Sequence, residues 1–144
     1  MTQLRSEDLV PVHGGCTQPV DRTVSLKERL ALIDEAGRLA SVVVTAADLS
    51  TIYRLADGAL SPLEGPMRSE EWQQVLEESS IVRAGKRFAW TIPLALPLTD
   101  QEASAISLGD SVAIRNESGE VVAIVDDVEV YDWDKAHYLS LIHI

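Results

Sequence analysis

The stretch Gly58-Ala59-Leu60-Ser61-Pro62-Leu63-Glu64-Gly65-Pro66-Met67 decides how this chain folds, because it specifies a shaped loop instead of a flexible one. Glycine can adopt positive φ and proline holds φ near about −65°, so the glycines and prolines of this stretch restrict its backbone. Leu60, Leu63 and Met67 give the loop apolar side chains to bury. We therefore expect a compact turn, in which Ser61 binds a backbone group.

Helices are expected on both sides of this loop. Capping boxes, in which a Ser or Thr stands three residues before an acidic residue, predict three helix starts. These boxes are Ser25 with Glu28, Thr45 with Asp48, and Thr99 with Glu102. The helix from Ser25 carries Leu26, Leu30 and Ile33 on one face and stops at Gly37, and the helix from Thr45 stops at Gly58. The helix from Thr99 ends near Gly109. A further helix, without a capping box, is expected to start at Ser69.

Strands are expected between the helices. Residues 41–44 and 112–114 are rich in β-branched or apolar side chains, and alternation indicates a further strand from Phe88 to Leu96, bent or at an edge because of its prolines. Residues 112–114 and 121–125 flank a turn, which is typical of a hairpin. Short helices and strands without a regular βαβ rhythm predict an α+β domain with a mainly antiparallel sheet.

Bulk composition bounds the function. A chain of 144 residues with 46% hydrophobic residues fits one domain. Its net charge of −11 repels phosphate backbones and anionic lipid surfaces, so neither nucleic acid nor a membrane is expected as a partner. There is no secretion signal and no long apolar run, which favours a cytoplasmic location. The single cysteine, Cys16, has no partner for an internal disulfide.

Candidate catalytic groups are isolated in the sequence. His13 beside Gly14 and Gly15 could bind an anion or accept a proton, but a structural hydrogen bond and a tight turn are the favoured interpretation. Ser61 lacks the flanking glycines of a nucleophile elbow. The turn Gly85-Lys86-Arg87 lacks the earlier glycine and the hydroxyl residue of a phosphate-binding loop.

Metal ligands and paired acids are also not assembled. His137 and His143 are six apart, which suits no common zinc spacing. Neighbouring acids diverge on a helix or strand, so we interpret the acidic pairs as solvated faces. The pairs are Glu70 with Glu71, Glu77 with Glu78, and Asp126 with Asp127. We therefore predict no catalytic, cofactor-binding or metal-binding residue in this chain.

Five ordered motifs give the chain a family resemblance. They are residues 9–15 (Leu-Val-Pro-Val-His-Gly-Gly) with 20–22, the loop 58–67, residues 90–94, residues 109–113, and residues 129–131 with 134–135. In this order and spacing they resemble the amino-terminal domain of ATP sulfurylase, or sulfate adenylyltransferase. Leu60 and Pro66 depart from the pattern, which has phenylalanine at both positions.

The resemblance implies a PUA-like domain over residues 9–136, with its sheet forming a pseudo-barrel flanked by short helices. It also implies a structural or inter-domain role for the residues that match the motifs: His13, Gly14, Gly15, Gly58, Ser61, Pro62 and Gly65. Enzymes of this family convert ATP and sulfate to adenosine 5′-phosphosulfate and pyrophosphate, with magnesium. Their catalytic motif, Gln-x-Arg-Asn-Pro-x-His, belongs to a later domain and does not occur here.

The ends of the chain fall outside the resemblance. Residues 1–8 are expected to be a mobile leader, and residues 137–144 are expected to be a truncated or non-family tail. The resemblance thus implies a non-catalytic fragment whose partner is the missing catalytic domain of a homo-oligomeric parent enzyme, acting in sulfate assimilation or sulfur oxidation. The alternatives are a free-standing PUA-like module that binds a protein or small molecule and, less favoured, a small autonomous enzyme.

Overall fold

The structure, a computed structural model, describes residues 10–142. The expected leader of residues 1–8 lies outside them. In chain order the elements are η2 (His13–Gly15), α1 (Leu26–Ala36), β1 (Ala40–Val43), α2 (Ala46–Ala56), α3 (Ser69–Glu78), β2 (Ser80–Arg83), β3 (Lys86–Ala89), α4 (Asp100–Ser104), β4 (Val112–Arg115), β5 (Val121–Val125) and α5 (Lys135–Ile142).

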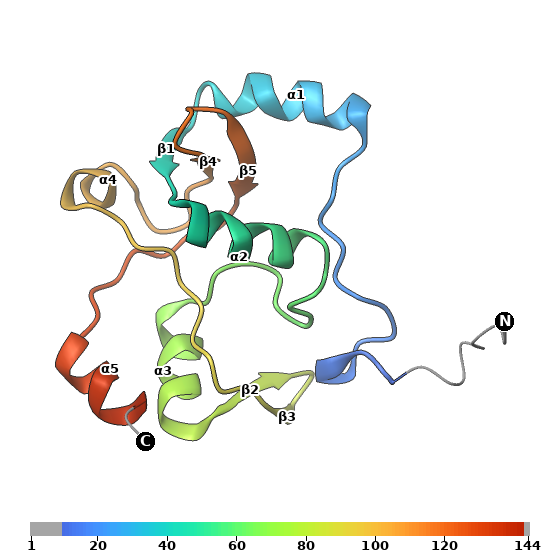
Figure 1. The fold of residues 1–144 in the computed structure, drawn as a ribbon, viewed down its shortest axis with the longest axis vertical. Coiled ribbons are helices and arrows are strands. Elements are labelled where there is room, and N and C mark those ends of the chain that lie inside the picture. The colour runs from blue at the N-terminus through green and yellow to red at the C-terminus, as the bar shows by residue number, and fades with distance from the viewer. Residues whose placement is uncertain (1–9, 143–144) are drawn as a thin grey trace, which may run out of the picture.

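The strands form two separate sheets, which lie in different halves of the molecule (Figure 1). In the larger sheet β4 lies between β1 and β5, parallel to β1 and antiparallel to β5. The smaller sheet is the antiparallel hairpin of β2 and β3. The α+β class and the mainly antiparallel pairing are confirmed. Within residues 10–142 the two sheets do not close into a barrel.

The helix starts follow the capping boxes. Ser25, Thr45 and Thr99 each accept a hydrogen bond from the backbone N–H three residues on, and the acidic residue there binds back to the cap. Glu102 also accepts a hydrogen bond from the N–H of Val43 at the edge of the larger sheet. Burial opposes ionisation of Glu102, but its hydrogen bonds from Thr99 and Val43 outweigh burial and lower its pKa. The last of these helices, α4, ends at Ser104, well before Gly109.

The predicted strand from Phe88 to Leu96 is wrong in its extent. Strand β3 ends at Ala89, and residues 90–99 contain no strand. The ladder ends at the pair of Ser80 and Ala89 because β2 begins directly after α3, and Pro93 and Pro97 lack the N–H that a longer strand would need. The N–H of Leu94 contacts Met67 Sδ instead, while its carbonyl accepts from the N–H of Met67.

Two apolar clusters form the core. The first lies around the larger sheet and contains Val42, Val44, Ile52, Val112 and Ile114. The second lies between α3, the smaller sheet and the loop of residues 58–67, and contains Leu55, Leu63, Met67, Val75 and Ile81. Helix α2 supplies Ile52 to one cluster and Leu55 to the other, so it joins the two halves.

The end of the described chain is helical. Asp134 accepts hydrogen bonds from the N–H groups of Ala136 and His137, and α5 then runs to Ile142 beside α3. Tyr138 stacks on Trp72 of α3, with ring centroids 5.9 Å apart. The boundary that we predict between domain and tail, at residues 136 and 137, falls inside this helix and stays a prediction.

Candidate functional site: a loop fastened by the amino-terminal segment

The residues singled out by the sequence gather where the segment from His13 to Val20 packs against the loop of residues 58–67. His13 begins η2, and its Nε2 donates to the carbonyl oxygen of Ala89 at 2.8 Å, at the end of β3. Its ring also lies within 6.1 Å, between centroids, of Phe88 and Trp90. The structural hydrogen bond expected of His13 is therefore present.

Gly14 and Gly15 allow the segment to approach its neighbours closely. Both have positive φ, 78° and 77°. A Cβ at Gly14 would lie 2.2 Å from Cγ of Pro62, and one at Gly15 would lie 3.1 Å from Cζ of Phe88. Gly14 thus packs directly on the proline of the loop, which explains why only glycine fits there.

Gly58 makes the second close approach, whereas Gly65 makes none. Gly58 has φ of 80°, and a Cβ there would lie 2.8 Å from Cβ of Pro19 and 3.1 Å from the carbonyl oxygen of Val20. A Cβ at Gly65 would meet no atom of the described chain within 4 Å. Gly65 therefore makes no close contact of the kind that Gly14, Gly15 and Gly58 make.

Ser61 is the buried centre of this contact. Its Oγ donates to the carbonyl oxygen of Gly58 at 2.6 Å and accepts from the N–H of Val20 at 2.8 Å. Both bonds use the hydroxyl in a structural role, so it is not arranged for nucleophilic attack. The backbone bond predicted for Ser61 is present, and the bond to Val20 shows in addition that the serine holds the amino-terminal segment.

Two further residues hold the loop, Tyr131 at Met67 and Arg83 at Pro62. Tyr131 belongs to the motif of residues 129–131, whereas Arg83 lies in none of the motifs. The hydroxyl of Tyr131 donates to the carbonyl oxygen of Met67 at 2.9 Å. Burial, with a smaller contribution from the charge of Glu129, raises the pKa of Tyr131 to about 12. Arg83 of β2 reaches the carbonyl oxygen of Pro62 with its Nε at 3.5 Å and pairs with Glu71.

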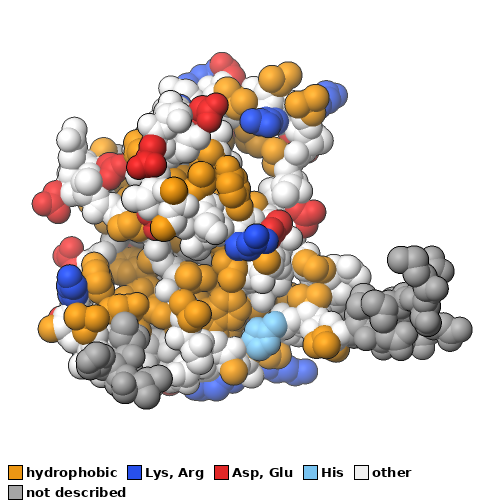
Figure 2. All heavy atoms as spheres, viewed as in Figure 1, with side chains coloured by type: hydrophobic (Ala, Val, Ile, Leu, Met, Phe, Trp, Pro, Cys, Tyr) orange, Lys and Arg blue, Asp and Glu red, His pale blue; other side chains and the backbone are white. Residues whose placement is uncertain are grey.

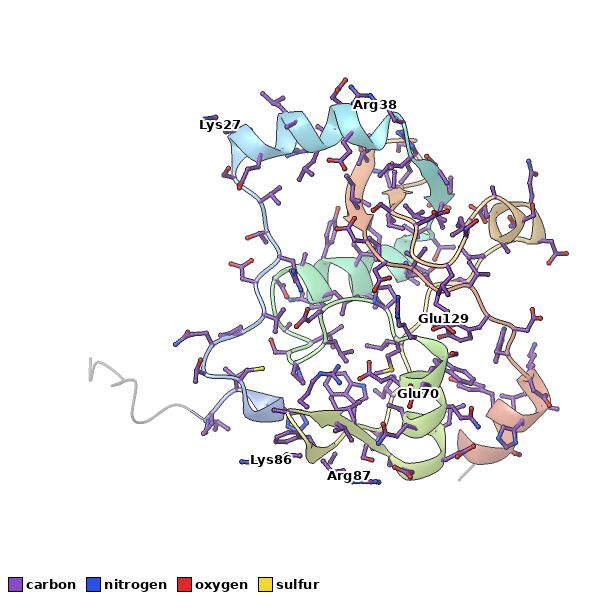
Figure 3. All side chains as sticks on the ribbon, turned by 180° about the vertical axis from the view of Figure 1, so that it is seen from behind. Lys27, Arg38, Glu70, Lys86, Arg87 and Glu129 are labelled. Atoms are coloured by element: carbon purple, nitrogen blue, oxygen red, sulfur yellow. The ribbon has the colours of Figure 1, made fainter. Side chains whose placement is uncertain are left out.

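The pair of Arg83 and Glu71 corrects one sequence interpretation. The side chains of Glu71 and Arg83 are only 25% and 29% exposed, so Glu71 does not lie on a solvated face. Two acidic pairs diverge as expected: Glu77 accepts from Gln73 while Glu78 pairs with Arg87. Asp126 accepts from Ser111 while Asp127 pairs with Arg68. Lys86 and Arg87 project outward from the β2–β3 hairpin and do not form a phosphate-binding loop (Figure 3).

The carboxylates with shifted pKa values are turn and cap residues. Hydrogen bonds from the hydroxyl and the N–H of Thr23 lower the pKa of Asp21, and those from the hydroxyl and the N–H of Ser25 lower the pKa of Glu28. Hydrogen bonds from the N–H groups of His137 and Ala136 lower the pKa of Asp134. Among residues 10–142 no group of three or more His, Cys, Asp or Glu residues could hold a metal ion. No helix of the described chain is long and apolar enough to cross a membrane.

This fold and loop define the class of the protein. The sequence matches the PUA-like domain family over residues 10–143, and the chain belongs to that family.

The relatives agree with the resemblance to sulfate adenylyltransferases. The chain is 41% identical over 133 residues to a sulfate adenylyltransferase from Pyropia yezoensis, covering 92% of this chain and 30% of that protein. It is 36% identical over 131 residues to one from Staphylothermus marinus, covering 91% and 33%. A solved structure of a hexameric APS kinase from Thiobacillus denitrificans superposes with a TM-score of 0.69 and 27% identity, covering 82% of this chain and 23% of that one. The chain thus spans about a third of the length of these sulfate adenylyltransferases.

Proposed function

We propose that this chain is the amino-terminal, non-catalytic domain of a sulfate adenylyltransferase, which joins ATP and sulfate and releases pyrophosphate. The observation that carries the proposal is the 41% identity to the Pyropia yezoensis enzyme, which extends over 92% of this chain but only 30% of that enzyme. ATP and magnesium then belong to the parent protein, and the partner of this chain is the catalytic domain. The parent is a cytoplasmic homo-oligomer in this proposal.

The arrangement of the site supports a structural role. Nucleotidyl transfer requires several cationic or amide donors directed at the reacting phosphate. In the described chain, Arg22, Arg83 and Arg87 instead pair with Glu64, Glu71 and Glu78. The hydroxyl of Ser61 and the ring of His13 are occupied by backbone groups. The contacts of Arg22, Ser61 and Arg83 involve the loop of residues 58–67, so these groups hold its shape instead of meeting a phosphate.

A domain exchange tests the proposal. The segment of the Pyropia yezoensis enzyme that matches this chain is replaced by this chain, and pyrophosphate release is measured with ATP, sulfate and magnesium. We expect sulfate-dependent turnover from the chimera and none from the isolated chain. Turnover by the isolated chain would show an autonomous enzyme. A folded chimera without turnover would favour a free-standing binding module.

A further inference from the structure

Helix α1 carries two apolar faces, of which only one is used inside the molecule. Leu32 is half-buried and Ala36 is fully buried, and α1 packs beside β5. Leu26, Leu30 and Ile33 recur at the spacing of four and three residues that places side chains on one helix face. They are 76%, 69% and 43% exposed.

The exposed face continues into a hollow beside it. Val24, Ile33 and Tyr53 line this hollow and are themselves exposed. Hydrophobic side chains lie along α1 and in the recess between α1 and α2, as Figure 2 shows. Lys27 and Arg38 mark the two ends of α1 in Figure 3. The α1 apolar face is defined as Val24, Leu26, Leu30, Ile33 and Tyr53, of which Val24, Ile33 and Tyr53 line the hollow.

The extent of the hollow distinguishes between ligands. It is one part of a space of about 2020 Å³ that is also lined by residues of α3, α4, β4, β5 and α5, so it is not a separate pocket of the about 300–1,000 Å³ that small molecules usually occupy. Large exposed apolar patches on soluble proteins mark sites of protein contact. The occupant suited to the α1 apolar face is therefore another protein surface, not a metabolite.

We propose that the α1 apolar face docks against the portion of a sulfate adenylyltransferase that lies outside the segment matched by this chain. This inference rests on the proposed function. The relatives from Pyropia yezoensis and Staphylothermus marinus are about three times as long as the segment they share with this chain. Each of them therefore holds a large body of protein covalently beside this domain, and that body is the occupant to which we assign the face.

The test places two glutamates on the face, in Leu26→Glu/Leu30→Glu, both in the isolated chain and in the chimera with the Pyropia yezoensis enzyme. The matched control is Leu108→Glu, because Leu108 is 75% exposed and lies outside α1. We expect both variants of the isolated chain to keep their circular dichroism and melting temperature. In the chimera, the double variant should be cleaved about tenfold faster at the domain junction by a protease, which corresponds to about 1.4 kcal/mol of docking energy. The control should be cleaved at the parent rate.

The outcomes separate docking from function. Equal rates of cleavage for the double variant, the control and the parent chimera would overturn the inference. If the parent chimera nevertheless turns over, the proposed function stays intact. Faster cleavage of the double variant in a chimera without turnover would support docking and reject the function. Should the isolated chain form a dimer that the double variant dissociates, the occupant would be a second copy and the inference would be wrong. A milder variant, Leu30→Gln, replaces the double variant if the latter does not fold.

Discussion

Gly14 carries the tightest packing among the glycines of the site, because a Cβ there would lie 2.2 Å from Cγ of Pro62. We expect Gly14→Ala to lower the free energy of unfolding by about 3 kcal/mol, since it combines positive φ with overpacking. Gly85→Ala is the matched control. Gly85 has a φ of 73°, close to the 78° of Gly14, but no atom of the described chain lies within 4 Å of its added Cβ.

The control should therefore cost only about 1 kcal/mol, the strain of the left-handed backbone. Urea unfolding of both variants measures the difference. Equal losses for the two variants would show that the contact between Gly14 and Pro62 is not tight in solution.

Tyr131 gives the site a pH-dependent signature. Its folded pKa, about 12, lies above the ordinary value of 10.0. A raised pKa means that the unfolded state loses the proton first, so the contribution to stability is complete below pH 10 and is lost as the pH rises through about 12. Tyr131→Phe should cost about 1 kcal/mol at neutral pH, because it removes the hydrogen bond to Met67.

The advantage of the natural chain over this variant should then shrink between pH 10 and about 12. Urea unfolding at several pH values measures it, and the ultraviolet absorbance of tyrosinate reports the ionisation. A constant difference between the two proteins over this range would contradict the buried environment of Tyr131.

At the level of elements, the β2–β3 hairpin turns on Ala84 and Gly85. Both have positive φ, 49° and 73°, as a type I′ turn requires. Positive φ strains the backbone of Ala84 but would not strain glycine. We therefore expect Ala84→Gly to raise the free energy of unfolding by about 0.5 kcal/mol, despite the greater conformational freedom of glycine in the unfolded chain. Ala105→Gly is the control, because Ala105 has a φ of −94° and is exposed. It should destabilise the chain, and thermal unfolding distinguishes the two signs.

Local signals explain which elements the sequence could predict. Capping boxes act within four residues, so the starts of α1, α2 and α4 follow from the sequence. The hairpin did not, because Ala84-Gly85 is a weaker turn signal than Asn-Gly and β2 follows α3 directly, through Ser79 at φ of 51°. The parallel pairing of Ala40 with Val112 depends on contacts between distant residues, which no local pattern contains.

The candidate site shows the same division between local and distant contacts. The glycines and Ser61 could be singled out because their motifs are local, and the bond from Ser61 to Gly58 spans three residues. Tyr131 meets Met67 across 64 residues, and His13 meets Ala89 across 76, so neither partner could be named in advance. The exposure of Leu26 and Leu30 was also hidden, because an apolar helix face in a sequence predicts burial without saying against what.

At the scale of the whole molecule, α2 makes the two halves depend on each other. Ile52 belongs to the cluster around the larger sheet and Leu55 to the cluster around the smaller sheet. Replacing either by alanine leaves a cavity, for which we expect a loss of about 3 kcal/mol in the free energy of unfolding. Because one helix carries both side chains, each substitution should destabilise both halves.

Two spectroscopic probes measure this coupling in a Trp133→Phe background, which leaves Trp72 and Trp90 as fluorophores beside the second cluster. Ile52→Ala lies in the first cluster, yet the fluorescence and the far-ultraviolet circular dichroism should shift together in one urea transition. Leu108→Ala is the control, and since Leu108 is exposed it should change stability by no more than about 0.5 kcal/mol. The opposite result is that Ile52→Ala leaves the fluorescence transition in place while the circular dichroism separates into two steps. It would mean that the halves fold independently and that α2 does not join them.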